Sequence, residues 1–599
     1  MSSKFTDFNI DPSGYAAFDA TSLKSLILTR LKDQGVFTDQ VFEGSNMSSI
    51  IDMVAYSYHT LMFYLNRTSS ETMFGDSQLY ENMNRIVKLL NYKPTGFQTS
   101  VLSFTSSASE NLPIGTYVLP RYTSVDVDGI PYTLNKDIIF SKPTSGVLDL
   151  SDKTGNFLLY QGEVTEYPRQ TASGDASETV TMAIDPTAIK IDHFSIGVYV
   201  QTTSGITEYT EVDSLYTESP ESTSYEKRLN ENYRYELQFG NGINGRKLES
   251  GDIIYIYYIK SLDNAGVVPV NSLIDKKLTL YTTPQFNSIK NSIYSSDDEL
   301  LNFETIETIS LDNKVGSTTP KEPETVDEIR QRAPLYFQGQ DRLITSDDFT
   351  THIKRHYGNI VNDVITVNNK TYLNGHIKYL HEEIGISNPS LESRVLYNQS
   401  KFSTSTNFNN VYLYLVPRIS SKTSINVQTN FVSSSQKEII KTNLDPKKAI
   451  GLDVTFMDPV YMAVDIGVAS NTLTHETPNN CVLQVTKTDN SINAISSIKK
   501  SVNDIISNYF KIENCTLGQL IDVDAIESQI LSIDGVAEVK TINNTTGEVS
   551  LGLSLVLWNP VYNQQDIRVY NQNIQLPYYK FPYYFDELSL LSRITVVDF

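Results

Sequence analysis

Apolar residues near the start of the chain recur three and four positions apart, the spacing that places side chains on one face of an α-helix. A short stripe ends at Gly35, a longer stripe runs for several turns, and Pro94 and Gly96 end a third. Residues 1–96 are therefore predicted to be helical. Periodicity alone leaves open an internally packed bundle or helices contributed to a coiled core shared with a partner. The residues that would face such a partner are Ile50, Ile51, Val54, Tyr58, Leu61, Leu65, Leu79, Met83, Ile86 and Leu90.

The pattern changes near residue 97, where short β-rich runs replace the helical period. Residues 101–104 and 253–258 are examples, and Gly, Ser, Thr and Asp fill the gaps between such runs. The close spacing of turn residues predicts an antiparallel sandwich or barrel for residues 97–320, rather than a parallel sheet with crossover helices. The Ser-, Thr- and Pro-rich stretch 317–323 predicts a linker. A domain boundary is therefore expected near Pro320, and this boundary is a candidate hinge if the protein has to switch between two arrangements.

Two helix starts follow this linker. In the first, Thr325 and Glu328 have the spacing of a capping box, in which a hydroxyl and a carboxylate accept from the free amides of the first turn. Pro334 is expected to cut this helix short, because proline removes a backbone donor from a helix interior.

The second start comes after the polar stretch 338–342. Thr345 and Asp348 repeat the capping box, and Ile344 and Phe349 flank it at the positions of a hydrophobic staple. Such a staple would fix how the chain enters the helix. The buried row of this helix is predicted to continue through Ile353.

Beyond residue 320, capped helices alternate with strand-like runs, which predicts α+β domains at residues 321–455 and 456–599. In the second of these, Gly518 precedes a helix for which Asp522 is the expected N-cap, and Gly535 is expected to release that helix into a strand. The predicted fold class is multidomain α+β, with an N-terminal helical bundle, a β-rich middle and C-terminal α+β domains.

The last domain ends in an aromatic tail at residues 578–585. So many aromatic side chains would be costly to leave in water. Packing onto their own domain and anchoring another subunit are both open, since interfaces favour Tyr and Phe. The candidate anchor residues are Tyr578, Phe581, Tyr583 and Phe585.

The composition of the chain limits the classes of partner that are expected. The chain has 70 acidic and 48 basic residues, for a net charge of −22. Such a surface repels phosphate backbones, so nucleic acid is not expected as a partner. The start of the chain lacks the features of a signal peptide and no apolar run approaches membrane-spanning length, so no membrane partner is expected. The two cysteines are too few to staple a chain of 599 residues and suit a reducing compartment.

Motifs that could indicate catalysis or the binding of a cofactor or metal are weak. The run 240–245 matches a dinucleotide-binding fingerprint, but it leads into another strand rather than a helix, so Gly240 and Gly242 are interpreted as a turn. His352 and His356 have the spacing of metal ligands, yet basic neighbours favour a surface pair. No catalytic, cofactor-binding or metal-binding residue is predicted, and no cofactor. Acidic pairs are too abundant for any one to stand out.

Four stretches occur in an order similar to that of the baseplate J-like family of contractile-tail phages. They are residues 91–96, residues 239–242 with the glycine turn, residues 324–349 with both capped helices, and residues 517–536. The chain resembles the large wedge subunits of that family.

The resemblance implies a structural protein without an active site. Wedge subunits of this family pair with themselves as dimers, bind a helical partner subunit through N-terminal helices, and link wedges into an inner ring around the tail hub. The ring passes receptor contact on to the contracting sheath. The expected partners are a second copy, other wedge subunits including the helical one, and hub and sheath-proximal proteins. The expected location is the virion tail baseplate, after assembly in the host cytoplasm.

On this hypothesis residues 50–65 and 79–90 supply the partner bundle and the region beyond residue 320 supplies self-pairing. Other classes remain. A receptor-binding or glycan-binding tail protein would share the acidic, Tyr-rich composition but would usually show fibre-like repeats, which are absent from the sequence. A polysaccharide-cleaving tail enzyme would need a carboxylate pair in a cleft. A wedge of a bacterial contractile injection system is a variant of the main hypothesis.

Overall fold

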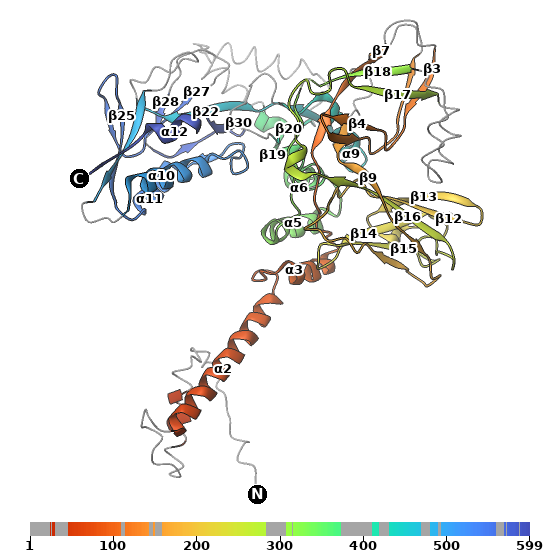
Figure 1. Ribbon diagram of the computed structural model, residues 1–599, viewed down its shortest axis with the longest axis horizontal. Helices are drawn as coiled ribbons and strands as arrows, with labels where there is room; N and C mark the ends of the chain where they lie inside the picture. Colours follow the sequence, from red (N-terminus) through yellow and green to blue (C-terminus); the bar gives the residue numbers. More distant parts are fainter. Residues whose placement is uncertain are drawn as a thin grey trace. The chain divides into compact units, whose positions relative to one another are not determined.

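The protein is described by a computed structural model (Figure 1). Contacts divide the chain into two units, Met1–Lys93 with Thr325–Gln331, and Pro94–Glu324 with Arg332–Phe599. The residues that the structure describes are 24, 25, 27–29, 31, 46–108, 114–142, 148–149, 158–282, 307–313, 315–372, 410–418, 431–468, 480–488, 493–558, 568–570, 572–585 and 587–598.

The first unit is helical, as the apolar stripes predict. It contains α2 (Asn46–Glu71), α3 (Tyr80–Val87), the short 3-10 helix η1 (Lys88–Leu90), and the start of α5 (Val326–Gly339). Neither Gly nor Pro interrupts the 26 residues of α2. Asn91, with a φ of 53°, ends η1 in the left-handed region, which Asn tolerates better than most residues.

The β-rich part of the second unit holds three sheets, and nearly all of their strand pairs are antiparallel. The first sheet has the order β1 (Val101–Ser103), β8 (Leu158–Gln161), β5 (Ile130–Thr133) and β4 (Ser124–Val127). The second has the order β6 (Ile138–Lys142), β3 (Gly115–Leu119), β17 (Lys277–Thr282), β18 (Glu307–Asp312), β2 (Thr105–Ala108) and β7 (Leu148–Asp149).

The third sheet is the largest. Its order is β10 (Thr179–Thr181), β15 (Tyr235–Phe239), β14 (Ser224–Leu229), β13 (Gly205–Val212), β12 (Gly197–Thr202), β16 (Ile253–Ser261) and β11 (Lys190–Ile191), and β9 (Glu163–Thr171) also pairs with β16. Only β13 and β14 run parallel within it. The prediction of a β-rich middle is confirmed.

The stretch around Pro320 is hydrogen-bonded to the β-rich part rather than loose. The amides and carbonyls of Gln98 and Lys321 bond reciprocally at 2.9 and 2.8 Å, and the amide of Thr318 donates to the carbonyl of Val101 at 2.9 Å. Ser317 and Thr318 are buried. The stretch expected to be a free linker is therefore packed against the β-rich part, because its backbone groups form hydrogen bonds there. We call residues 317–324 the strap.

An α+β region follows the strap. Its sheet has the order β19 (Val361–Asn368), β20 (Asn410–Pro417) and β21 (Asp453–Met457), and its helices are the end of α5, α6 (Ser346–His356) and α9 (Ser434–Leu444). Phe349 and Ile353 of α6 pack with Leu413 of β20. The same core includes Val101 and Leu158 of the β-rich part, so it runs across the expected boundary at residue 320. Residue 455, the expected end of this region, lies inside β21.

The C-terminal region has two four-stranded sheets. One has the order β28 (Arg568–Tyr570), β27 (Leu555–Trp558), β22 (Val460–Ile466) and β30 (Lys580–Tyr584), and the other has the order β26 (Val549–Leu551), β25 (Val536–Asn543), β23 (Cys481–Lys487) and β31 (Ile594–Asp598). A two-stranded pair joins β24 (Leu520–Ile521) to β29 (Ile574–Gln575).

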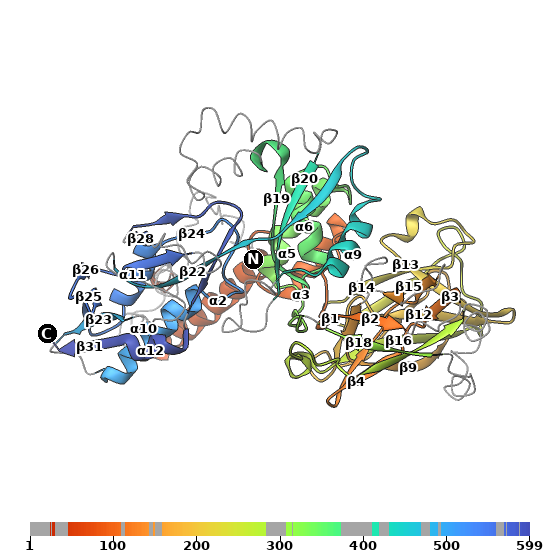
Figure 2. The ribbon, with the colours of Figure 1, turned by 90° about the horizontal axis from the view of Figure 1, so that it is seen from above.

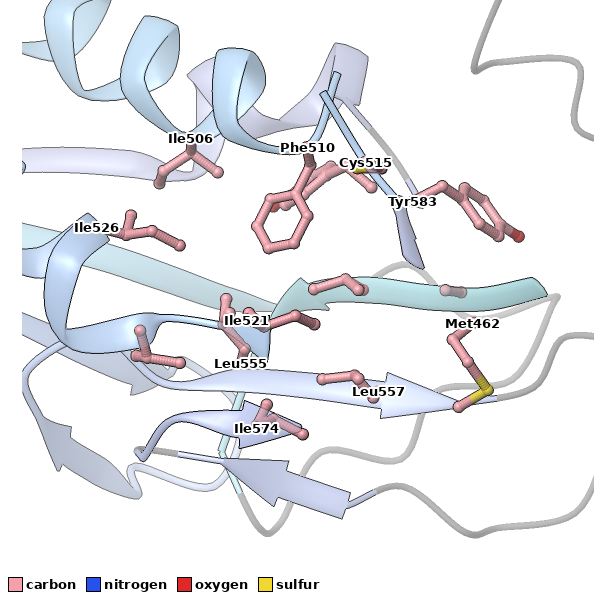
Figure 3. Close-up of a cluster of buried hydrophobic side chains, with 14 of the residues drawn as sticks. Met462, Ile506, Phe510, Cys515, Ile521, Ile526, Leu555, Leu557, Ile574 and Tyr583 are labelled. Atoms are coloured by element: carbon pink, nitrogen blue, oxygen red, sulfur yellow. The ribbon is translucent and has the colours of Figure 1, made fainter. Parts of the chain in front are cut away.

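Three helices complete this region: α10 (Ile495–Tyr509), α11 (Val523–Leu531) and α12 (Glu587–Arg593) (Figure 2). Ile506 and Phe510, in and just after α10, point toward Leu555 and Leu557 of β27 (Figure 3). The multidomain α+β fold class is confirmed.

One helix end differs from the prediction. Pro334 lies inside α5, which continues to Gly339. An interior proline costs about 3 kcal/mol, and burial of Ile329 and Ala333, which precede it in the helix, offsets that cost. The helix ends instead at Gln340 and Asp341, whose φ angles of 47° and 58° lie in the left-handed region.

Candidate interaction surface

The surface of α2 is mostly uncovered. Near its start, Ile51 and Ala55 are buried, and Lys24 Nζ lies 2.6 Å from Asp52 Oδ1, so Lys24 lies against the start of α2. Farther along, Val54, Tyr58, Leu61 and Leu65 are between 42% and 55% exposed. Ile50 is exposed to the same extent.

The exposed residues continue a coiled-coil repeat. Ile51, Val54, Tyr58, Leu61 and Leu65 follow one another at steps of three, four, three and four, which is the a and d spacing of a heptad. We call these five residues the α2 seam. Such a seam in a stable coiled coil is covered along its length by a facing helix, whereas here only Ile51 is buried.

A second apolar group lies away from the seam on the same helix. Its members are 54% to 71% exposed, and they are Met53, Tyr56, Phe63 and Tyr64. A helix that is apolar on more than one side is normally enclosed by other helices. The surface of α2 is thus shaped for more than one neighbour.

The third stripe behaves differently. Met83 is fully buried, and Ile86 and Leu90 are half-buried. Leu79 alone among these candidates is largely exposed. The partner residues predicted in the third stripe are therefore for the most part buried or half-buried, while those predicted on α2, apart from Ile51, are exposed.

The turn between α2 and α3 is tied together by Glu71 and Arg330. The Glu71 carboxylate accepts from the Asn82 side chain at 3.1 Å and from the Leu79 amide at 3.2 Å. These bonds, that from Asn82 above all, lower the pKa of Glu71. Arg330 at the start of α5 donates to the backbone carbonyls of Phe74 and Ser77. No sequence pattern indicated this joint, because Glu71 and Arg330 are far apart in the chain.

Both capping boxes form. The Glu328 carboxylate accepts from the amide of Thr325 at 3.0 Å, and the Asp348 carboxylate accepts from the amide of Thr345 at 2.8 Å. The staple prediction is wrong, because Ile344 is 66% exposed. The preceding Leu343 is buried in its place, since its amide donates to the carbonyl of Lys447 at 3.1 Å and draws it toward the core.

The glycine run is a turn, as predicted. It joins β15 to the chain leading to β16, and no helix follows it. A Cβ on Gly240 would lie 2.2 Å from the backbone carbon of Gly245, and Gly242 has a φ of 86°. Both positions therefore require glycine.

The second pair of family glycines also occupies constrained backbone. Gly518 and Gly535 have φ angles of 64° and 94°. A Cβ on Gly518 would come within 2.9 Å of the backbone of Tyr578. Asp522 caps α11 as expected, accepting from the amide of Ala525 at 2.9 Å.

The aromatic tail packs largely on its own domain. Phe581 and Tyr583 are buried in the C-terminal core. Tyr578 and Phe585 are half-buried, and Tyr578 lies edge-on against Tyr414, with ring centroids 5.5 Å apart. An anchoring role therefore remains a prediction for Tyr578 and Phe585, which keep accessible surface.

His352 and His356 are not the exposed pair that the sequence suggested. His352 is buried, and the two rings lie 4.4 Å apart by centroid. Apolar residues of α6 lie at neighbouring positions of the same face, so the histidines turn inward with them. No group of three or more metal-ligating side chains occurs within the described ranges. No helix in the described part of the chain combines the length and hydropathy needed to cross a bilayer.

A buried charged cluster in the C-terminal region was not foreseen. Asp465 of β22 is fully buried and lies 2.6 Å from Arg593 Nη2 at the end of α12. The hydroxyl of Tyr584 donates to the same carboxylate at 2.7 Å. The cluster joins both four-stranded sheets, because the Arg593 guanidinium also donates to the carbonyl of Cys481 at 3.5 Å.

The fold and this surface define a multidomain α+β protein that presents an uncovered apolar helix. No family model matches the sequence. Over 383 residues, 61% of the chain, the sequence is 22% identical to the baseplate wedge protein gp6 of Enterobacteria phage T4. The match covers 54% of that protein, so the chain spans about half the length of this relative.

Two solved structures are similar at low scores. A chain of the anti-feeding prophage baseplate has 11% identity and a TM-score of 0.28, with 93% of this chain and 90% of that chain covered. A chain of the type VI secretion system TssK-TssF-TssG baseplate subcomplex has 8% identity and a TM-score of 0.26, with 68% and 96% covered.

Proposed function

We propose that this chain is a structural wedge subunit of a contractile-tail baseplate and not an enzyme. It pairs with itself and links neighbouring wedges into the inner ring, which couples receptor contact to sheath contraction. Its site of action is the tail baseplate of the virion, reached after assembly in the host cytoplasm. The similarity to a phage baseplate wedge protein supports this proposal.

The observation that carries it is the open α2 seam. Four of its five residues are exposed in the free chain. Burial of a large apolar side chain contributes about 1.5–3 kcal/mol, so a facing helix would gain substantially by covering the seam. We infer that α2 binds a helical wedge subunit, and that the second apolar group on α2 faces a further helix of the same bundle.

The test is capture of the helical wedge subunit by the full chain. Val54→Glu combined with Leu61→Glu places two charges in the seam, and we expect capture to fall at least tenfold in a pull-down with that subunit purified from the same virion. Asn66→Glu is the matched control, because Asn66 is an exposed residue of α2 outside the seam. Unchanged capture by the seam variant would exclude α2 as the binding helix.

A further inference from the structure

Three of the seven histidines meet where α6 faces the β-rich part of the second unit. His352 and His356 lie one turn apart on α6, with ring centroids 4.4 Å apart. The ring of His356 lies 5.7 Å from that of Phe194, and the ring of Phe194 lies 4.8 Å from that of His193. The proposed wedge function uses none of these rings.

The surroundings of this pair are rich in cations. Arg355 lies beside both histidines on α6, and its guanidinium stacks 4.5 Å over the ring of Tyr336. Lys447 approaches from the segment after α9. Asp341 lies 4.0 Å from His352 Nδ1, and it already pairs with Lys447 at 2.8 Å. Asp348 lines the same pocket as His352, together with Arg342, and is engaged in the capping box of α6. Carboxylates that are already engaged cannot balance two more positive charges at this site.

Hydrogen bonds at the C-terminal end of α6 join this helix to the β-rich part. The side-chain amide of Gln98 donates to the carbonyl of Arg355 at 2.9 Å, and its oxygen accepts from the amide of Asn359 at 2.9 Å. The Asn359 side chain donates to the carbonyl of Thr99 at 2.9 Å. The histidines therefore lie beside the bonds that join two parts of the fold.

Both imidazoles are neutral at pH 7. Burial lowers the pKa of His352 to about 4, and Lys447 adds to this effect. Burial also holds the pKa of His356 well below its usual value, with His352 and Arg355 contributing. His352 forms a 2.9 Å hydrogen bond between its Nε2 and Asn443 Oδ1, which favours the charged form but does not reverse the shift.

We propose that His352 and His356 form an acid-sensitive latch that holds α6 against the β-rich part of the molecule. While neutral, the two rings pack against each other and against Phe194. Once protonated, they repel each other, Arg355 and Lys447, and α6 separates from Gln98 and Thr99. The latch concerns regulation of the fold and does not depend on the wedge function.

The direction of the pH effect follows from linkage. An unfolded or opened histidine titrates near pH 6.5, so below that pH the opened state binds protons that the closed state does not. Stability of the closed state is complete above pH 6.5 and is lost as the pH falls toward 4. For His352 alone, the opened population should rise roughly thirtyfold between pH 7.5 and pH 5.

Hydrogen exchange on the full chain tests the latch. We expect protection of amides in α6, after correction for the intrinsic pH dependence of exchange, to fall at least roughly thirtyfold from pH 7.5 to pH 5, because both histidines contribute. Amides of β23 in the C-terminal region provide the internal reference. The double variant His352→Gln with His356→Gln should lose this acid response, because glutamine does not titrate. His59→Gln is the control, since His59 is an exposed histidine of α2.

Two results would overturn the proposal. One is an unmodified chain in which α6 and β23 respond alike to acid, and this measurement needs no variant that might fail to fold. The other is a folded double variant that keeps the full acid response of α6.

Discussion

At the residue scale, the charged side chains that are buried in the core have the largest effect on stability. Asp465, Tyr584 and Arg593 come from three elements and satisfy one another where both C-terminal sheets meet. Burying such charges is costly unless every partner is present. A sequence pattern could not indicate this cluster, because each of its members is ordinary in its local context.

Removal of one member should therefore be severe. We expect Asp465→Ala to destabilise the C-terminal region by about 3–5 kcal/mol, because it leaves the Arg593 charge buried without its carboxylate. Urea unfolding followed by fluorescence measures this directly, since Trp558 is the sole tryptophan of the chain and is buried in β27.

The matched control removes both charges. Asp465→Leu combined with Arg593→Met should cost less than Asp465→Ala alone, because no uncompensated charge remains. If the double variant were as unstable as the single one, the cluster would matter for its packing rather than for its charge.

At the element scale, helical periodicity predicted α2 and α3, but not which of their faces are covered by other elements. Repetition of apolar residues is a local property, so it is visible in sequence. Coverage of Met83 and exposure of Leu61 depend on which other elements approach, and the two stripes look alike until those elements are placed. Likewise, α5 passes Pro334 because Ile329 and Ala333 are buried beside it.

The joint between α2 and α3 should depend on one carboxylate. We expect Glu71→Ala to make residues 72–79 more sensitive to limited proteolysis in the free chain, because it removes the acceptor for the Leu79 amide and the Asn82 side chain. Glu81→Ala is the control, since its ion pair with Arg85 at 2.7 Å is exposed and contributes little. Equal sensitivity of the two variants would show that Arg330 alone holds the turn.

At the scale of the whole molecule, the second unit is continuous across both boundaries expected within it. The strap at 317–324 is bonded to the β-rich part, and Asp363 of β19 accepts from the Leu517 amide at 2.7 Å. Asn362 also donates to the carbonyl of Ile512 at 2.9 Å. These bonds join regions that composition had separated, and they argue against a free hinge at Pro320.

The proposed self-pairing is a property of the full chain. Light scattering over a range of concentrations should give about twice the chain mass of 67.4 kDa, because pairing is assigned to the region beyond residue 320. The variant with Val54→Glu and Leu61→Glu should keep that mass. A lower mass for this variant would assign self-pairing to α2. If the unmodified protein had the mass of a single chain at every concentration, self-pairing of the free protein would be contradicted.

The sequence by itself determined the helical start, the β-rich middle, both capping boxes and the glycine turns, because each depends on residues close together in the chain. It also identified the candidate residues of α2. The tertiary structure alone decided that the α2 seam stays open, that Phe581 and Tyr583 are enclosed, that His352 turns inward, and that Asp465 meets Arg593. These outcomes depend on the energies of contacts between distant segments, which no local sequence pattern can indicate.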